Sequence, residues 1–175
     1  ILDTVNFSGG GTYLDGTSSE DNEALIRQCN GVSNSSDVAE YYMTGNATET
    51  AVSVQGTYYK IAGVTLAGSI VEKFTLTDNR ATYVGALTTD FKVDGIAAVT
   101  SGNNRVISIA VAKNGSIVAA SAASSTTNSG GRSEGIHTQT IVQLTSGDYI
   151  EIWGANTTNT DDFTGESLST IITAL

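Results

Sequence analysis

Few side chains in this sequence are suited to covalent or metal chemistry, and they are scattered along the chain. His137 is the only histidine and Cys29 the only cysteine among 175 residues. A Ser-His-Asp arrangement needs a base that a carboxylate orients. The alternation in GIHTQTIVQL instead places His137 on one strand face with Gln139 and Ile141. We therefore interpret His137 as a structural or interface residue and predict no catalytic residue.

Motifs of common enzyme classes are missing as well. The sequence contains no GxSxG, no GxxxxGK[ST] and no GxGxxG that opens a strand–helix unit. A zinc site needs several cysteine or histidine ligands, and the chain has one residue of each type. The sequence predicts a protein that is not an enzyme and has no cofactor.

Carboxylates are the remaining candidates for a metal site. Asp161 and Asp162, followed by Glu166, lie in a loop rich in Asn and Thr, and Glu151 lies in the strand before it. Oxygen-rich loops of this kind can hold calcium, but the DxDxDG spacing of a calcium loop is absent. We expect a solvated acidic loop, with Glu151, Asp161 and Asp162 as the candidates if calcium binds.

Charge and hydropathy exclude two classes of partner. The chain carries 18 Asp and Glu against 8 Lys and Arg, a net charge of −10, and its basic residues do not cluster. Phosphate contacts need clustered Lys and Arg, so nucleic acid is not an expected partner. No apolar run approaches the roughly 20 residues that span a membrane, so membrane insertion is not expected either.

The first 38 residues differ from the rest of the chain. SSEDNEALIRQCNG, which follows a Gly-rich turn, has a serine cap, acidic residues in its first turn and a terminal glycine. These are typical of a helix, and Cys29 would pack on its apolar face. The alternative is a strand and turn like one rung of a β-helix. We expect residues 1–38 to form an N-terminal arm or stem that docks or connects the following domain.

Residues 39–175 are dominated by strand patterns. Runs of alternating or β-branched residues recur to the end of the chain, and Gly/Asn turns separate them. The clearest turn is Asn114-Gly115, a pair that tolerates the positive φ of a tight hairpin. About ten short strands at this spacing predict an all-β antiparallel sandwich, and a jelly roll in particular.

Two of the strands carry apolar or small residues on both faces. In NRVISIAVAK, Ile107 and its alternate neighbours face one way, while Ser108 and Ala110 face the other. In DYIEIWGAN, Tyr149, Glu151 and Trp153 lie opposite the isoleucines. An antiparallel strand with apolar bulk on both faces is expected to meet a second buried surface, such as a subunit interface.

Four segments in order resemble one known family. They are EYYMTGNATETAVSVQGTYYKIAG, FTLTDNRATYVGAL, VTSGNNRVISIAVAKNGSIV and TQTIVQLTSGDYIEIWGANTTNTDDFT. Together they resemble the jelly-roll modules of tailed-bacteriophage virion proteins that are related to the complement globular head and tumour necrosis factor superfamily. The resemblance covers roughly residues 39–175.

The resemblance implies two packed antiparallel sheets, a tight homotrimer and a place on the virion surface. It implies a capsid decoration protein, a head fibre, or the tip of a tail fibre or tailspike, with other virion proteins as partners. Modules of this family bind rather than catalyse. The residues expected at the subunit interface are Tyr149, Glu151, Trp153, Ser108 and Ala110. Three Glu151 carboxylates close together would repel, so we expect a cation or a basic side chain, with Arg105 and Lys113 as the candidates, to compensate them.

Three functions remain open on the sequence alone. The first is a trimeric virion module for assembly and host attachment. The second is an extracellular protein that assembles into tubes, filaments or a coat. The third is a lectin-like module that binds a host cell-surface glycan through aromatic residues and the acidic loop, the candidates being Trp153, Tyr41, Tyr42, Tyr58 and Tyr59.

Overall fold

The computed structural model describes residues 37–133 and 135–175. The helix, or alternatively the β-helix rung, that we predict before residue 32 lies outside these residues. The first described strand begins at Val38, next to the expected domain boundary. The division into an arm over residues 1–38 and a jelly roll over residues 39–175 stays a prediction.

Five strands form the core of the first sheet, in the order β11–β7–β13–β1–β4. All of their pairings are antiparallel, and the short strand β2, Glu49–Thr50, adds to β13. The bounds of the five are β11 Ile136–Leu144, β7 Thr89–Thr100, β13 Phe163–Ala174, β1 Val38–Thr44 and β4 Leu66–Glu72.

The second sheet has the order β10–β8–β12–β6–β5 and is antiparallel as well. Two short strands extend it, because β3 pairs with β12 and β9 pairs with β8. The bounds are β10 Ala123–Thr126, β8 Val106–Lys113, β12 Tyr149–Asn156, β6 Arg80–Tyr83, β5 Phe74–Thr77, β3 Tyr59–Lys60 and β9 Ser116–Ile117.

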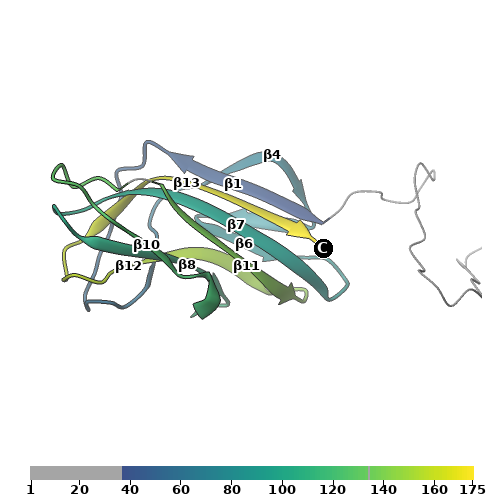
Figure 1. The fold of residues 1–175 in the computed structure, drawn as a ribbon. Coiled ribbons are helices and arrows are strands. Elements are labelled where there is room, and N and C mark those ends of the chain that lie inside the picture. The colour runs from purple at the N-terminus through teal and green to yellow at the C-terminus, as the bar shows by residue number, and fades with distance from the viewer. Residues whose placement is uncertain (1–36, 134) are drawn as a thin grey trace, which may run out of the picture. The chain divides into compact units, whose positions relative to one another are not determined.

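The two sheets pack face to face, as Figure 1 shows, and the predicted jelly-roll sandwich is confirmed. More than half of residues 39–175 lie in strands, and the only helical element among the described residues is one 3-10 turn, η1, at Ala119–Ser121. No helix in this part of the chain is long and apolar enough to cross a membrane.

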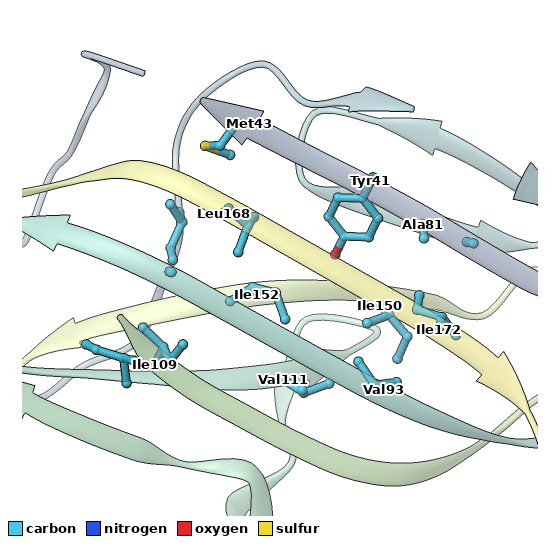
Figure 2. Close-up of a cluster of buried hydrophobic side chains, with 14 of the residues drawn as sticks. Tyr41, Met43, Ala81, Val93, Ile109, Val111, Ile150, Ile152, Leu168 and Ile172 are labelled. Carbon is cyan, nitrogen blue, oxygen red and sulfur yellow. The ribbon is translucent and has the colours of Figure 1, made fainter. Parts of the chain in front are cut away.

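Alternation along the strands builds the core between the sheets. Tyr41, Val93 and Ile172 face inward from the first sheet, while Ile109 and Ile152 face them from the second, and all five are fully buried (Figure 2). Strands with one buried and one exposed face bury every second side chain, which explains the alternating burial of β1, β7 and β11.

The described chain enters and leaves the sandwich at the same end. Val38 at the start of β1 pairs with Thr173 near the end of β13, and Figure 1 shows both strand ends together. The loops after β1, β7 and β12 therefore lie at the opposite end. The two ends of the described chain and these loops thus lie at opposite ends of the sandwich.

The predicted hairpin at Asn114-Gly115 is confirmed. Both residues have positive φ, 51° and 74°, and the turn joins β8 to β9 through the pair Lys113 and Ser116. The Asn114 side chain also bonds to the turn between β11 and β12, since its Nδ2 donates to Asp148 Oδ1 at 2.7 Å. Asp148 accepts further hydrogen bonds from the Thr145 amide and from Lys113.

A buried asparagine completes the second sheet where no strand does. β12 pairs with β6 only at Tyr149 and Ile150, and with β3 only at Trp153 and Gly154. In the gap, Asn79 Nδ2 donates to the Ile152 and Ile61 carbonyls at 2.7 and 3.0 Å, and the Ile152 amide donates to Asn79 Oδ1. The side-chain amide of Asn79 thus replaces a missing peptide group of the sheet.

Replacement of Asn79 by Ala should destabilise the fold by about 3 kcal/mol, since buried main-chain groups lose their partner. Urea unfolding of the purified protein measures this change. Asn104→Ala is the matched control, because Asn104 also has a positive φ, 56°, but is exposed. The control isolates the backbone strain of alanine at positive φ, which we expect to cost about 1 kcal/mol. If both variants lost the same free energy of unfolding, the hydrogen bonds of the Asn79 amide would contribute nothing to stability.

The pH dependence of stability should include a contribution from Asp148. Hydrogen bonds from Asn114, from the Thr145 amide and from Lys113 hold the pKa of Asp148 well below its usual range. A depressed carboxylate pKa stabilises the fold above the unfolded-state pKa of about 4, and this stability is lost as the pH falls toward the folded-state pKa. Asp148→Asn should therefore narrow the difference in melting temperature between pH 7 and pH 2.5. Asp78→Asn, at an exposed turn, should leave that difference unchanged.

Candidate interaction surfaces

The predicted interface residues lie on the outward side of the second sheet, where the chain itself covers most of them. Ser108 is 7% exposed, Ala110 is fully buried and Glu151 is 1% exposed, while Tyr149 and Trp153 remain half-buried. Tyr58 covers part of this surface, since its hydroxyl lies 2.6 Å from Ser108 Oγ. β8 therefore has a second buried surface, as expected. Within a single chain, residues of the same chain cover this surface. Contact of the five residues with another subunit stays a prediction.

Glu151 is the centre of a charged cluster on this outward side, hereafter the Glu151 cluster. Arg80 donates from Nε and Nη2 to Glu151 Oε1 at 2.8 Å, and Lys60 Nζ lies 3.4 Å from the same oxygen. Trp153 Nε1 donates to Glu151 Oε2 at 2.8 Å. The Arg80 guanidinium also lies 4.0 Å from the centre of the Tyr149 ring. A buried carboxylate is thus fully paired, as burial of a charge requires.

The basic residues we expected beside Glu151, Arg105 and Lys113, pair elsewhere, and that expectation is wrong. Arg105 Nε lies 2.6 Å from Asp161, and Lys113 Nζ lies 2.9 Å from Asp148. Arg80 and Lys60 take their place, because β6 and β3 pair with the same edge of β12, one before Glu151 and the other after it. Sequence alone does not show that these two short strands lie on either side of Glu151.

The calcium candidates do not come together. Hydrogen bonds from Asn159 and Arg105 lower the pKa of Asp161, and Asp162 Oδ1 accepts from the Val52 amide. Within residues 37–133 and 135–175, no three Asp, Glu, His or Cys side chains are grouped so that they could hold a metal ion. The acidic loop is instead held by Arg105, which pairs with Asp161, and by the Val52 amide, which donates to Asp162.

His137 lies on the outward side of the first sheet, on one face with Gln139 and Ile141 as predicted. Its Nε2 contacts Asp94, and the other oxygen of that carboxylate lies 2.8 Å from Lys92 Nζ. The hydrogen bonds from Lys92 and His137 lower the pKa of Asp94. Among the described residues no serine or threonine hydroxyl hydrogen-bonds to His137, so this pair lacks the nucleophile of a catalytic triad.

The tyrosines considered for sugar binding have different environments. Tyr41 is fully buried in the core, where burial raises the pKa of its hydroxyl (Figure 2). It has no surface to offer to a ligand, so its selection as a sugar-binding candidate is wrong. Tyr58 and Tyr59 are half-buried beside the second sheet, and Tyr42 is 37% exposed on the first.

The largest uncovered set of apolar side chains lies on the outward side of the first sheet. Strand pairing fixes the neighbours: Leu66 lies opposite Tyr42, Tyr42 opposite Ser169, and Ser169 opposite Ile96. Ile96 is 47% and Ile141 is 63% exposed. We call this surface the association face and define it by five residues, Tyr42, Leu66, Ile96, Ile141 and Ile171.

Small residues hollow the association face between its larger ones. A groove of about 340 Å³ opens where small side chains alternate with Tyr42 and Ile96. Its small lining residues include Ala98, Ser167 and Ser169. A large apolar side chain of a partner fits such a groove, because it buries area against both walls without displacing a bulky side chain.

Sequence reasoning missed the association face and the partners of Glu151. The signal for the face was present, because Ile171 directly precedes Ile172 and Ile96 is followed by Ala97 and Val99. Adjacent apolar residues in a strand must point to opposite sides, so one of each pair lies outside the core. The partners of Glu151 had no comparable signal.

The chain resembles solved structures in fold, although its sequence matches no family model and no curated protein. Murine APRIL at pH 5.0 superposes with a TM-score of 0.53 at 6% identity, over 78% of this chain and 98% of that one. The PRD1 vertex protein P5 superposes with a TM-score of 0.52 at 9% identity, over 79% of this chain and 96% of that one. Eiger TNF from S. frugiperda superposes with a TM-score of 0.50 at 12% identity, over 79% of this chain and 91% of that one.

These likenesses confirm that the chain has a jelly roll of the kind found in a TNF protein and in a phage vertex protein. The identities are too low to carry more than the fold. The resemblance inferred from the sequence therefore holds for the architecture, and function has to be argued from the surfaces.

Glu151→Gln should destabilise the fold by about 3 kcal/mol, since it leaves Arg80 and Lys60 beside a neutral, buried amide. Asp161→Asn is the control, because it removes an equal charge from a carboxylate whose side chain is 43% exposed. We expect the control to change the free energy of unfolding much less, because solvent screens an exposed ion pair. Chemical denaturation of both variants at pH 7 checks this, and equal effects would show that the burial of Glu151 contributes nothing.

Proposed function

We propose that the chain is a virion structural protein of a bacteriophage, a homotrimeric jelly-roll module displayed on the particle surface. It acts in assembly with other virion proteins and in host attachment, as a capsid decoration protein, a head fibre, or the tip of a tail fibre or tailspike. The observation that carries the proposal is an exposed apolar association face on a fold that the PRD1 vertex protein P5 shares.

Exposed apolar residues support self-association of the chain. Tyr42, Ile96, Ile141 and Ile171 are each more than a third exposed on one sheet face. Single exposed apolar residues are common, but monomeric proteins seldom expose several on one sheet face, and two of these, Tyr42 and Ile96, also line the groove. Copies of this chain are the occupant that we propose, because the resemblance to trimeric modules concerns this same sandwich.

Charge on the association face is compatible with its burial between subunits. Lys92 and His137 both contact the Asp94 carboxylate, so the central polar groups of the face already have partners within one chain. Buried charges are tolerated in interfaces when they are paired and hydrogen-bonded. We therefore place the subunit contact on the first sheet. Three of the five residues that the sequence predicts at the interface, Ser108, Ala110 and Glu151, are buried within the second sheet.

A binding role rather than a catalytic one agrees with the surfaces described. The described carboxylates lie mostly in ion pairs or main-chain hydrogen bonds, and His137 lies on an open sheet face. A catalytic acid or base needs a position where a substrate can be enclosed. We infer that the chain acts through its surfaces.

Assembly into tubes, filaments or an extracellular coat is the second candidate. A contact between two different surfaces of the same chain closes into a ring only if its rotation allows, and otherwise propagates into a filament. The association face alone does not distinguish these outcomes. Negative-stain electron microscopy does, because discrete particles favour the virion module and extended polymers favour the filament.

Light scattering of the purified protein tests the association face. We expect a mass of about 54 kDa for three copies of the 18.0 kDa chain. Ile96→Glu should return the mass to that of a single chain, because three buried carboxylates would have no partners. Leu87→Glu adds the same charge at a loop residue that is 75% exposed, and should remain trimeric. A wild-type mass of 18 kDa would overturn the proposal.

A further inference from the structure

The Glu151 cluster carries a surplus of positive charge. Arg80 and Lys60 both contact Glu151, and no other described carboxylate forms an ion pair with either of them. The net charge of the cluster is therefore +1, whereas the whole chain carries −10. One cation is enough to neutralise a buried carboxylate, so pairing with Glu151 does not account for the second.

The two cations are accessible and held in place. The side chains of Lys60 and Arg80 are 34% and 37% exposed, while Glu151 is 1% exposed. Arg80 is fixed from two sides, by Glu151 Oε1 and by the Tyr149 ring 4.0 Å away. Groups that are ordered before a ligand arrives lose little entropy on binding, which favours affinity.

Two aromatic side chains lie on the same face as the cations. Tyr149, Glu151 and Trp153 alternate along β12 and point outward, and Trp153 lies opposite Lys60 in the β12–β3 pair. The Trp153 ring is oriented by the hydrogen bond from its Nε1 to Glu151 Oε2. An aromatic ring offers apolar area to a ligand, while the cations beside it bind an anionic group.

We propose that Lys60, Arg80, Tyr149 and Trp153 form a binding site for a sugar that bears a carboxylate. The carboxylate pairs with Lys60 and the free edge of the Arg80 guanidinium, and the apolar side of the sugar ring packs on Trp153. A neutral sugar lacks the charged contact, and an acidic peptide lacks the rigid ring. The site gives a location and a ligand class to the host-attachment part of the proposed function, on which its biological meaning rests.

Trp153 is the only tryptophan, so its fluorescence reports directly on this site. The whole 175-residue chain is titrated with sodium N-acetylneuraminate and sodium D-glucuronate at low ionic strength. We expect a saturable change in Trp153 emission with at least one of them, which weakens when sodium chloride is raised. N-acetylglucosamine, which is neutral, should give no saturable change at the same concentrations.

Lys60→Gln is the decisive variant, because it removes one charge while the Arg80–Glu151 pair remains. It should raise the Kd for the acidic sugar at least about tenfold, the effect of losing one charge-assisted contact. Arg132→Gln removes an equal charge from a side chain that is 67% exposed in the loop before β11, and should leave the Kd unchanged. Circular dichroism melting of both variants confirms that they are folded.

Three results would overturn the proposal. They are no saturable response to either acidic sugar, an equal response to N-acetylglucosamine, or an unchanged Kd in Lys60→Gln. An equal or stronger response to a glutamate-containing peptide would replace the sugar by an acidic protein segment and overturn it too. Light scattering of the same samples keeps the result separate from self-association, since the site lies on the second sheet and the association face on the first.

Discussion

The second sheet depends on the side chain of Asn79. β12 has the short strands β6 and β3 at its two ends on one edge, and between them the Asn79 amide bonds to both main-chain groups of Ile152, while the Ile61 amide donates to the Ile152 carbonyl. An unpaired buried amide costs as much as a lost hydrogen bond, and Asn79 Oδ1 accepts the one that the Ile152 amide would otherwise lack on this edge. The Asn79 amide therefore connects the two short strands along this edge of β12, whose other edge pairs with β8.

Glu151 lies directly beside this junction and draws β3 and β6 together through Lys60 and Arg80. Its carboxylate is 1% exposed, while Lys60 and Arg80 beside it keep about a third of their side-chain surface exposed. Because two cations pair with one carboxylate, the Glu151 cluster keeps a net charge of +1. In the site that we propose, structure and recognition use the same side chains, because the carboxylate holds two strands while the cations keep exposed surface.

The two outward sides of the sandwich are suited to different tasks. The association face carries exposed isoleucines and a groove lined by Tyr42 and Ile96, and Lys92 and His137 both contact Asp94 near its centre. The Glu151 cluster is polar, positively charged and lined by aromatic rings. Because the described chain enters and leaves at one end, a module that packs through its first sheet still presents its second sheet and its far loops.

The sequence by itself determined the architecture, because alternation and turn chemistry act between close neighbours. The positive φ at Asn114 and Gly115 follows from their residue types, and the inward faces of β7 and β12 follow from a period of two. Only the tertiary structure decided which outward face is covered. The cover of Ser108 is Tyr58, fifty positions away, and the partner of Glu151 is Arg80, seventy-one positions away. Periodicity shows that a strand has two faces, but the chain segment that covers either face is set by the packing of distant residues.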